Sequence, residues 1–387
     1  MYIVKAYRSA VGKAKKGSFR NYRSDDLAVR VIDYMMKNTP EVSPEMIDDV
    51  IVGCANPEGE QGLQMGRHIS ARALGKVVPG MTVNRYCASG LETISIASGK
   101  IAAGMGDIYI AGGTESMSMI PMTGYKLAPS YETAVAQPNY LIGMGLTAEA
   151  VANKYEVSRD DQDEFAFNSH RKAAAAIANG HFAKSIVPVD VTEVWVENGE
   201  RKEKTFTMQQ DEGVRADTSK EVLGKLRAVF AQGGSVTAGN SSQTSDGAAF
   251  TMVVSEKMVK ELNLDPIARL VTCSVGGVDP LYMGIGPCAA IPKALNRAGL
   301  KLSDIDLIEL NEAFASQALA VIRTAGLNPD KVNINGGAIA LGHPLGCTGA
   351  KLTTQLLDDL ERTGGKYGMV TACVGGGQGI AGIFEKL

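Results

Sequence analysis

The chain has 387 residues, of which 45% are hydrophobic and 21% are charged. This balance is typical of a soluble globular protein with two or three packed units. Its 39 basic and 42 acidic residues give a formal net charge of −3. That charge argues against a nucleic-acid-binding protein, which presents a strongly basic face, but it allows a local basic patch for one phosphorylated cofactor.

The cysteines and the N-terminus indicate a reducing compartment. None of the six cysteines belongs to a C-x-x-C pair (Cys54, Cys87, Cys273, Cys288, Cys347 and Cys373). A chain of this length does not need disulfides for stability, so we expect free thiols and a cytoplasmic location. Residues 1–5 predict a strand rather than a signal peptide, and no run of about 18 apolar residues predicts a membrane span.

Strands and helices alternate along the chain, which indicates the α/β class. Residues 307–310 have the apolar composition of a buried strand. Residues 313–325 predict a helix that ends at Gly326, and residues 352–362 predict another that ends at Gly364. Glycine often follows a helix because it readily adopts the left-handed conformation found there.

The two ends of the chain contain an internal repeat. Residues 43–54 (SPEMIDDVIVGC) resemble residues 303–311 (SDIDLIELN). A strand-like stretch leads into Cys87 and a helix, and a similar stretch leads into His343 and a helix. Two similar halves that pack together would bring these equivalent turns to a shared centre, and the repeat is too long for a solenoid.

The segment between the halves differs in character. Residues 120–244 hold most of the charge clusters and a polar helix that opens with the capping box Ser158 and Asp161. Residues 189–197 are strand-like and end in a polar turn. We expect an inserted loop domain that covers the substrate. A surface decoration without a role in binding is the alternative.

The first chemical motif is the stretch 84–91 (NRYCASGL), which contains Cys87. A strand ends here and a helix of small residues begins. At a helix N-terminus the dipole and free N–H groups favour a thiolate, and a nearby base would lower the pKa of the cysteine further. A packed core cysteine is the alternative.

The second motif is the stretch 335–346 (NGGAIALGHPLG), which surrounds His343 with non-polar residues. The chain has only four histidines, and this one is the best candidate for a general base. Imidazole can accept a thiol proton near neutral pH and then donate a hydrogen bond to an oxyanion. A structural core histidine is the alternative.

Two further motifs follow strands. Cys373 begins the stretch CVGGGQG, whose consecutive glycines, among them Gly375, expose backbone N–H groups suited to an oxyanion hole. A phosphate-binding loop or a plain tight turn would give the same pattern. Asn311 begins the stretch NEAF, where it could hold a water or a carbonyl oxygen, or simply cap a helix. The cysteines and histidines lack the paired spacing of a zinc site.

These four motifs, in this order, resemble the thiolase family, and the similarity covers nearly the whole chain. The resemblance implies that Cys87 is the acylated nucleophile and that His343 activates it. It implies that Cys373 is the acid and base, and that Asn311 holds a water in one oxyanion hole. The backbone N–H groups of Cys87 and Gly375 would form a second hole.

The resemblance also implies the fold. Thiolases have duplicated half-domains that form a five-layered α-β-α-β-α core with an inserted loop domain. Transferred to this chain, the N-terminal half comprises residues 1–119 plus 245–267. The inserted loop domain over the coenzyme A site comprises residues 120–244, and the C-terminal half comprises residues 268–387.

By position in the family pattern, five residues resemble coenzyme A contacts. Ser242 corresponds to the residue near the pantetheine, and Arg215 corresponds to a contact with the nucleotide end. Met144, Met283 and Phe314 correspond to residues that line the pocket.

The subfamily resembled is the degradative 3-ketoacyl-CoA thiolase of fatty acid β-oxidation. The stretches 283–287 (MGIGP) and 241–247 (SSQTSDG) match it, and Gly143 stands where the biosynthetic type carries a histidine. The implied reaction is cleavage of a 3-ketoacyl-CoA by CoA to acetyl-CoA and a shortened acyl-CoA. A biosynthetic acetoacetyl-CoA thiolase is the alternative.

The resemblance implies no metal and no permanently bound cofactor, with coenzyme A as co-substrate. It implies a homodimer or homotetramer and, in some degradative enzymes, a hydratase/dehydrogenase partner. A β-ketoacyl synthase is the closest rival, although it pairs its cysteine with two histidines or a histidine and an asparagine. A non-catalytic lipid carrier is a rival from another class, but it would not need Cys87, His343 and Cys373 together.

Overall fold

The computed structural model describes residues 1–387 and contains two half-sheets in which four equivalent strands follow the same order, and the N-terminal half adds one parallel strand at its outer edge. In each half a parallel pair is followed by two antiparallel neighbours. The N-terminal half runs β4 (Gly80–Val83), β3 (Asp49–Gly53), β5 (Ile108–Ser116), β9 (Ser245–Val254) and β1 (Tyr2–Ser9). The C-terminal half runs β11 (Leu307–Leu310), β12 (Tyr367–Val374), β13 (Gln378–Lys386) and β10 (Ala268–Gly277).

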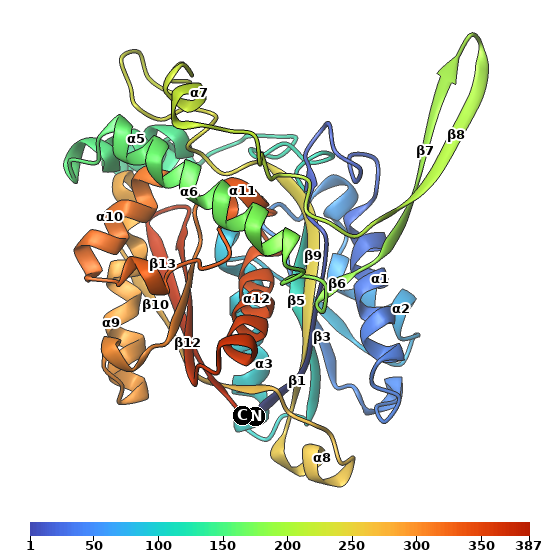
Figure 1. Cartoon of the computed structure of the whole chain (residues 1–387). Helices are drawn as coiled ribbons and strands as arrows, with labels where there is room; N and C mark the ends of the chain where they lie inside the picture. Colours follow the sequence, from blue (N-terminus) through green and yellow to red (C-terminus); the bar gives the residue numbers. More distant parts are fainter.

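Helices form three layers around these half-sheets (Figure 1). The middle layer, between the half-sheets, consists of α3 (Ser89–Ala102) and α12 (Thr348–Thr363). The outer layers are α1 (Ser24–Lys37) with α2 (Met65–Ala73) on one side and α9 (Gly286–Ala298) with α10 (Ala315–Ala325) on the other. The expected five-layered α-β-α-β-α fold is therefore confirmed. One strand pair, Ile3 opposite Ala268, also joins the half-sheets edge to edge.

The two middle helices cross at glycines. A Cβ on Gly90 would lie 2.6 Å from the backbone nitrogen of Ala350, and one on Gly349 would lie 2.2 Å from the nitrogen of Leu91. Only glycine permits this close approach. Because α3 begins just after Cys87 and α12 begins just after His343, the crossing brings the two equivalent turns together.

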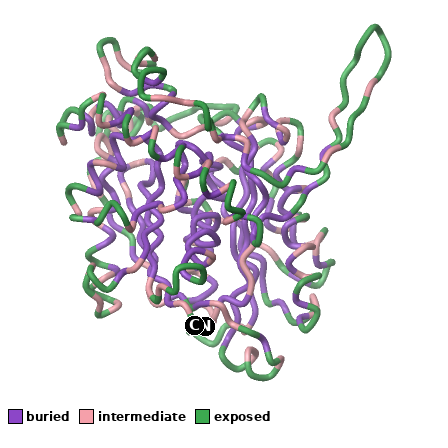
Figure 2. Tube along the Cα trace, viewed as in Figure 1, coloured by how far each residue is buried: buried purple, intermediate pink, exposed green.

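Apolar residues fill the spaces between the layers, and the strands are buried on both faces (Figure 2). In β3 the side chains of Val50 and Val52 join the cluster under α1 and α2, whereas Ile51 faces the middle helices. In β12 Met369 joins the cluster under α9 and α10, whereas Val370 faces the middle helices. Coverage on both sides explains why these strands are continuously apolar.

The segment between the halves contains four helices and three strands. It holds α4 (Tyr131–Ala136), α5 (Met144–Lys154), α6 (Arg159–Ala178), β6 (Ile186–Val187), β7 (Val189–Glu197), β8 (Glu200–Met208) and α7 (Lys220–Gly224). The predicted capping box of Ser158 and Asp161 is present at the start of α6. The β7–β8 hairpin projects from the body, whereas α5, α6 and α7 lie over one end of the half-sheets (Figure 1). The domain boundaries stay a prediction.

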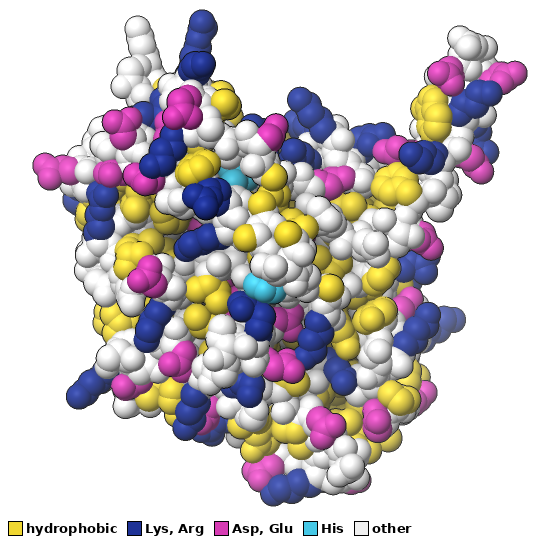
Figure 3. Space-filling model, in the orientation of Figure 1, with side chains coloured by type: hydrophobic (Ala, Val, Ile, Leu, Met, Phe, Trp, Pro, Cys, Tyr) yellow, Lys and Arg dark blue, Asp and Glu magenta, His cyan; other side chains and the backbone are white.

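Three short elements complete the fold: β2 (Gly12–Lys13), α8 (Glu256–Glu261) and α11 (Ala338–Leu341). None of the helices is long and apolar enough to cross a membrane. Basic and acidic side chains are interspersed on the face that Figure 3 shows.

Candidate active site

One cavity of about 400 Å³ brings most of the predicted site residues together. Its lining includes Cys87, His343, Gly375, Ser242, Met144, Met283 and Phe314. Asn311 and Cys373 are fully buried behind this lining. Asn311 is hydrogen-bonded to His343, and Cys373 packs against Met283 and Phe314. Arg215 is exposed on the loop before α7 and does not line the cavity.

Cys87 lies in a 3₁₀ turn, Tyr86–Ala88, that leads directly into α3. The turn is fixed by Ser89, whose Oγ accepts from the Arg85 N–H at 2.9 Å and donates to the Tyr86 carbonyl at 2.7 Å. Burial raises the pKa of the Cys87 thiol to about 12, while the N–H groups of Gly375 and of Cys87 itself oppose that rise. Those two N–H groups are the pair expected to form an oxyanion hole, and both are near enough to the sulfur to influence its pKa.

His343 is buried between α11 and α12, and its hydrogen bonds define its tautomer. Thr348 Oγ1 donates to the Pro344 carbonyl at 2.9 Å, so it accepts from His343 Nδ1–H, 2.6 Å away. His343 Nε2 is then the unprotonated nitrogen. Burial, followed by the charge of Lys351, lowers the pKa of His343 to about 3. The resting site therefore pairs a neutral imidazole with a neutral thiol, and the thiolate forms only when the proton moves.

Asn311 follows β11 and contacts the histidine. Its Nδ2 lies 3.3 Å from His343 Nε2 and can donate to it. Its Oδ1 is buried without any hydrogen-bond partner. A buried unpaired acceptor of this kind requires a water or a ligand, which fits the expected water-holding role. The simpler alternative, that Asn311 caps the following helix, is wrong, because the N-cap of α10 is Phe314.

Cys373 is the second-last residue of β12, and Gly375 begins the turn between β12 and β13. Burial, followed by the neighbouring Cys87, raises the pKa of the Cys373 thiol well above its ordinary range, which keeps it protonated. The turn closes through Gly376 and Gly377, which have φ of 78° and 83°. Only glycine adopts these angles without strain, and the turn places the Gly375 N–H at the cavity.

Glu115, near the end of β5, joins the two halves next to the cavity lining and was not predicted from the sequence. Its buried carboxylate accepts from the N–H groups of Ala55 at 2.7 Å and Asn56 at 3.3 Å. It also accepts from Gln61 Nε2 at 2.7 Å and from the Gly346 N–H at 2.8 Å. The last bond fixes the loop that carries His343. A lone acidic residue in a strand of otherwise apolar and small residues was the only sequence signal.

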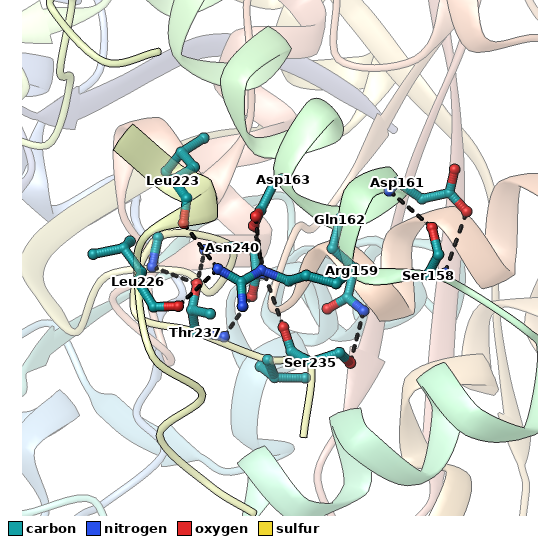
Figure 4. A network of polar contacts seen from close by, with 12 residues as sticks. Ser158, Arg159, Asp161, Gln162, Asp163, Leu223, Leu226, Ser235, Thr237 and Asn240 are labelled. Carbon is teal, nitrogen blue, oxygen red and sulfur yellow. Dashed lines mark hydrogen bonds and ion pairs between the residues drawn. The ribbon is translucent and has the colours of Figure 1, made fainter. Parts of the chain in front are cut away.

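A second unpredicted network fixes the segment that carries Ser242 (Figure 4). Arg159 Nε donates to Asp163 at 2.7 Å, and Asp163 accepts from Asn240 Nδ2 at 2.9 Å. The Asn240 carbonyl accepts from the Ala315 N–H at 2.9 Å, and the Ser242 N–H donates to the Ala313 carbonyl at the same distance. The network thus aligns the end of the insertion with the start of α10.

The cavity lining contains no aspartate, glutamate, lysine or arginine. The Cys87 thiol, the His343 imidazole and two N–H groups are its reactive groups. A cysteine and a neutral base beside preorganised donors suit covalent acyl transfer. The doubled fold and this site together define a cysteine-dependent acyl-transfer class.

Comparison with known proteins identifies the family within this class. Residues 1–257 match the thiolase N-terminal domain, and residues 264–386 match the thiolase C-terminal domain. The 3-ketoacyl-CoA thiolase of Bacillus subtilis is 53% identical over 385 residues, which cover 99% of this chain and 98% of that protein. The chain belongs to the thiolase family, which confirms the resemblance seen in its motifs.

Solved structures agree with this assignment. Human mitochondrial 3-ketoacyl-CoA thiolase in complex with CoA is 39% identical with a TM-score of 0.89, covering 100% of this chain and 98% of that one. The acetyl-CoA acetyltransferase of Bacillus anthracis is 39% identical with a TM-score of 0.88, at the same coverage. The fold alone therefore does not separate the degradative from the biosynthetic activity.

Proposed function

We propose that the protein cleaves 3-ketoacyl-CoA with CoA to acetyl-CoA and a shortened acyl-CoA, through an acyl group on Cys87. The observation that carries this proposal is that one cavity brings together the Cys87 thiol, neutral His343 and Gly375 at the glycine turn. The names and high identity of the 3-ketoacyl-CoA thiolase relatives support the degradative reaction over the biosynthetic alternative.

In the first half-reaction, Cys87 Sγ attacks the 3-keto carbon and its proton moves to His343 Nε2. The oxyanion is stabilised by the N–H groups of Cys87 and Gly375. The bond between carbons 2 and 3 then breaks. The acetyl-CoA enolate that leaves is stabilised by protonated His343 and a water held by Asn311, and Cys373 protonates its carbon.

In the second half-reaction, the Cys373 thiolate takes the proton of free CoA. The CoA thiolate attacks the acyl-cysteine, the shortened acyl-CoA leaves, and Cys87 recovers its proton from His343. Deep burial suits Cys373 to both steps, because a thiol held neutral by its surroundings becomes a strong base once it has given up its proton. No metal or redox cofactor enters these steps, since the thioester itself acidifies the carbon.

Ser242, Met144, Met283 and Phe314 are proposed to contact the pantetheine arm of CoA, because they line the cavity beside Cys87. Arg215 is proposed to contact the nucleotide end, since its exposed position outside the cavity is compatible with a phosphate ligand at the surface. We further propose a cytoplasmic homodimer or homotetramer, with a hydratase/dehydrogenase partner as a further association.

The test is a thiolysis assay with purified protein. CoA is added to the 3-ketoacyl-CoA, and the loss of the 3-ketoacyl-CoA absorbance measures the reaction. Acetyl-CoA and the shortened acyl-CoA should form in equal amounts, and Cys87→Ala should abolish both. A synthase-like enzyme would need an acyl carrier substrate and would give no thiolysis. A carrier would bind the substrate without turnover, and either result would contradict the proposal.

A further inference from the structure

The β7–β8 hairpin projects from the body of the molecule as a separate two-stranded sheet (Figure 1). Its base is anchored, because Val191 and Met208 are buried in the core cluster under α1 and α2. The last polar contact with the body is the ion pair of Glu193 with Arg20, at 2.7 Å. Beyond that pair, the hydrogen bonds and ion pairs of the hairpin all lie within the hairpin itself. Residues 194–203 therefore have no polar contact with the rest of the chain.

This free part of the hairpin lacks the features that normally stabilise or protect an isolated strand pair. A two-stranded hairpin alone is only marginally stable in water, and a third strand or a packed helix is what stabilises it. The two strands contain no proline, and they pair without a bulge up to the turn at Asn198 and Gly199. Both outer edges therefore present rows of unpaired backbone N–H and C=O groups, which are a template for pairing with another chain.

The two outer edges of the hairpin differ in their charge. The charged side chains of β7 are all acidic, namely Asp190, Glu193 and Glu197, so two copies of this edge would repel each other. By contrast, β8 carries both signs in the run 200–204 (ERKEK). Mixed signs do not protect an edge as a run of one sign does, so β8 is the edge that is open to pairing.

The charges of β8 are complementary to a second copy of β8 that runs antiparallel about a two-fold axis at Lys202. Glu200 then lies opposite Lys204 of the second copy, and Arg201 lies opposite its Glu203. Opposite charges that face each other directly stabilise an antiparallel pair. Lys202 meets its own copy, but it is already paired with Glu200 at 2.7 Å. Moving the axis by one residue would set Arg201 against Arg201 or Glu203 against Glu203, so only this register matches both pairs.

We propose that β8 pairs with β8 of a second copy of this chain, which joins the two hairpins into one four-stranded sheet about a two-fold axis. The contact is closed, because the acidic β7 edges that remain outside would repel a further copy. It specifies one interface of the proposed homo-oligomer and does not depend on the proposed reaction. A pairing of two short strands buries little surface, so we expect it to dissociate at about micromolar concentrations.

The first test exchanges the charges of Arg201 and Glu203. Within the hairpin these residues lie opposite Val196 and Val194, so their charges can be changed without breaking an ion pair to β7. The mass by light scattering should fall by half when the wild type is diluted from about 100 µM to about 1 µM. Arg201→Glu sets glutamates opposite each other and should raise the concentration of half dissociation about tenfold or more. Arg201→Glu combined with Glu203→Arg restores the opposite charges and should restore the wild-type value.

The second test uses the position at the axis. Lys202→Cys places two cysteines directly opposite each other, at a Cα separation of about 4.5–5.5 Å that a disulfide can span. Mild oxidation should therefore give a covalent dimer on a denaturing gel. Val196→Cys is the control, because Val196 is 74% exposed on β7 and random collision would link it at least as fast. The native cysteines are buried or half-buried, so they should add little background.

Three outcomes would overturn the hairpin contact. They are a wild-type mass of one chain at every concentration, a mass that Arg201→Glu leaves unchanged, and cross-linking of Val196→Cys as fast as Lys202→Cys. None of the substituted residues lines the cavity at Cys87, so thiolysis per chain should be the same in all variants. Absence of thiolysis in the wild type would contradict the proposed function alone. A thermal melt of each variant checks that it is folded.

Discussion

His343 owes its tautomer to a threonine five residues further along the chain. Thr348 gives its own proton to the Pro344 carbonyl, so it accepts from Nδ1–H instead of donating to that nitrogen. Nε2 is then unprotonated, as the proposed transfer of the Cys87 proton requires. The sequence motif identified the histidine, but it did not identify the nitrogen that acts, because that depends on where α12 places Thr348.

His343→Ala should slow acylation of Cys87 by about 10²–10⁴-fold, the usual effect of removing a general base. The dissociation constant of the substrate should change little, because Met144, Met283 and Phe314 still line the cavity. Rapid-quench measurement of the acyl-enzyme gives the first quantity and equilibrium titration gives the second. Acylation at the wild-type rate would show that His343 is only structural.

Cys373→Ser should separate the two kinds of chemistry at the site. Acyl transfer from acetyl-CoA to Cys87 should survive in part, because CoA leaves as a thiolate, which depends less on protonation by Cys373 than a leaving carbon does. Carbon–carbon cleavage of acetoacetyl-CoA should fall much further, because a serine hydroxyl is a far weaker proton donor than a thiol. Both reactions are measured on one preparation. An equal decrease in both would show that Cys373 has no selective acid and base role.

At the scale of elements, Glu115 binds three segments through one carboxylate. Both of its oxygens accept from N–H donors, so a glutamine there must turn its NH₂ group toward donors. Each donor left unpaired in the interior costs about 1–3 kcal/mol. Glu115→Gln should therefore lower the free energy of unfolding by about 2 kcal/mol or more. It should also lower kcat, because the Gly346 loop carries His343.

Urea unfolding and steady-state kinetics check this expectation. Glu256→Gln is the matched control, because Glu256 is exposed at the start of α8 and lies outside the cavity. If Glu115→Gln behaves like this control in both assays, the carboxylate does not hold the two halves of the site together.

Helix boundaries show what local sequence patterns miss at this scale. Helix α10 was expected from residue 313 but begins at Ala315, because Phe314 is extended with φ −146° and ψ 146°. Helix α12 was expected from residue 352 but begins at Thr348, since its first turn is buried against α3 instead of showing an amphipathic pattern. Both helices end at the predicted glycines, Gly326 and Gly364.

At the scale of the whole molecule, the repeat predicted that equivalent turns would share a centre, and the structure places the Cys87 and His343 turns there. The sequence did not show what holds them together. The helix crossing at Gly90 and Gly349 and the strand pair of Ile3 with Ala268 join residues hundreds of positions apart. Single-sequence patterns contain no information on such pairs. The motifs therefore predicted which residues meet at the cavity, but they did not predict the contacts that hold those residues there.

The buried neutral His343 also affects the stability of the whole protein. Its pKa is lowered from 6.5 to about 3, so between these values the unfolded chain binds a proton that the folded chain does not. Stability must then fall as the pH falls. Between about pH 7 and about pH 5 the loss from this residue is about 2 kcal/mol. Urea unfolding at both pH values should show that the free energy of unfolding falls less in His343→Ala than in the wild type. Part of the loss that remains in the variant comes from His170, whose pKa is lowered to about 4. An equal loss in both proteins would mean that His343 is protonated in the folded state.

The acylated residue is the most direct test of the central claim. The protein is incubated with acetoacetyl-CoA in the absence of free CoA, digested and mapped by mass spectrometry. The account predicts an acetyl group on Cys87, because Cys87 shares a cavity with His343 and Gly375, whereas Cys373 and Cys347 do not line it. An acetyl group on Cys373 or Cys347, with Cys87 unmodified, would contradict it.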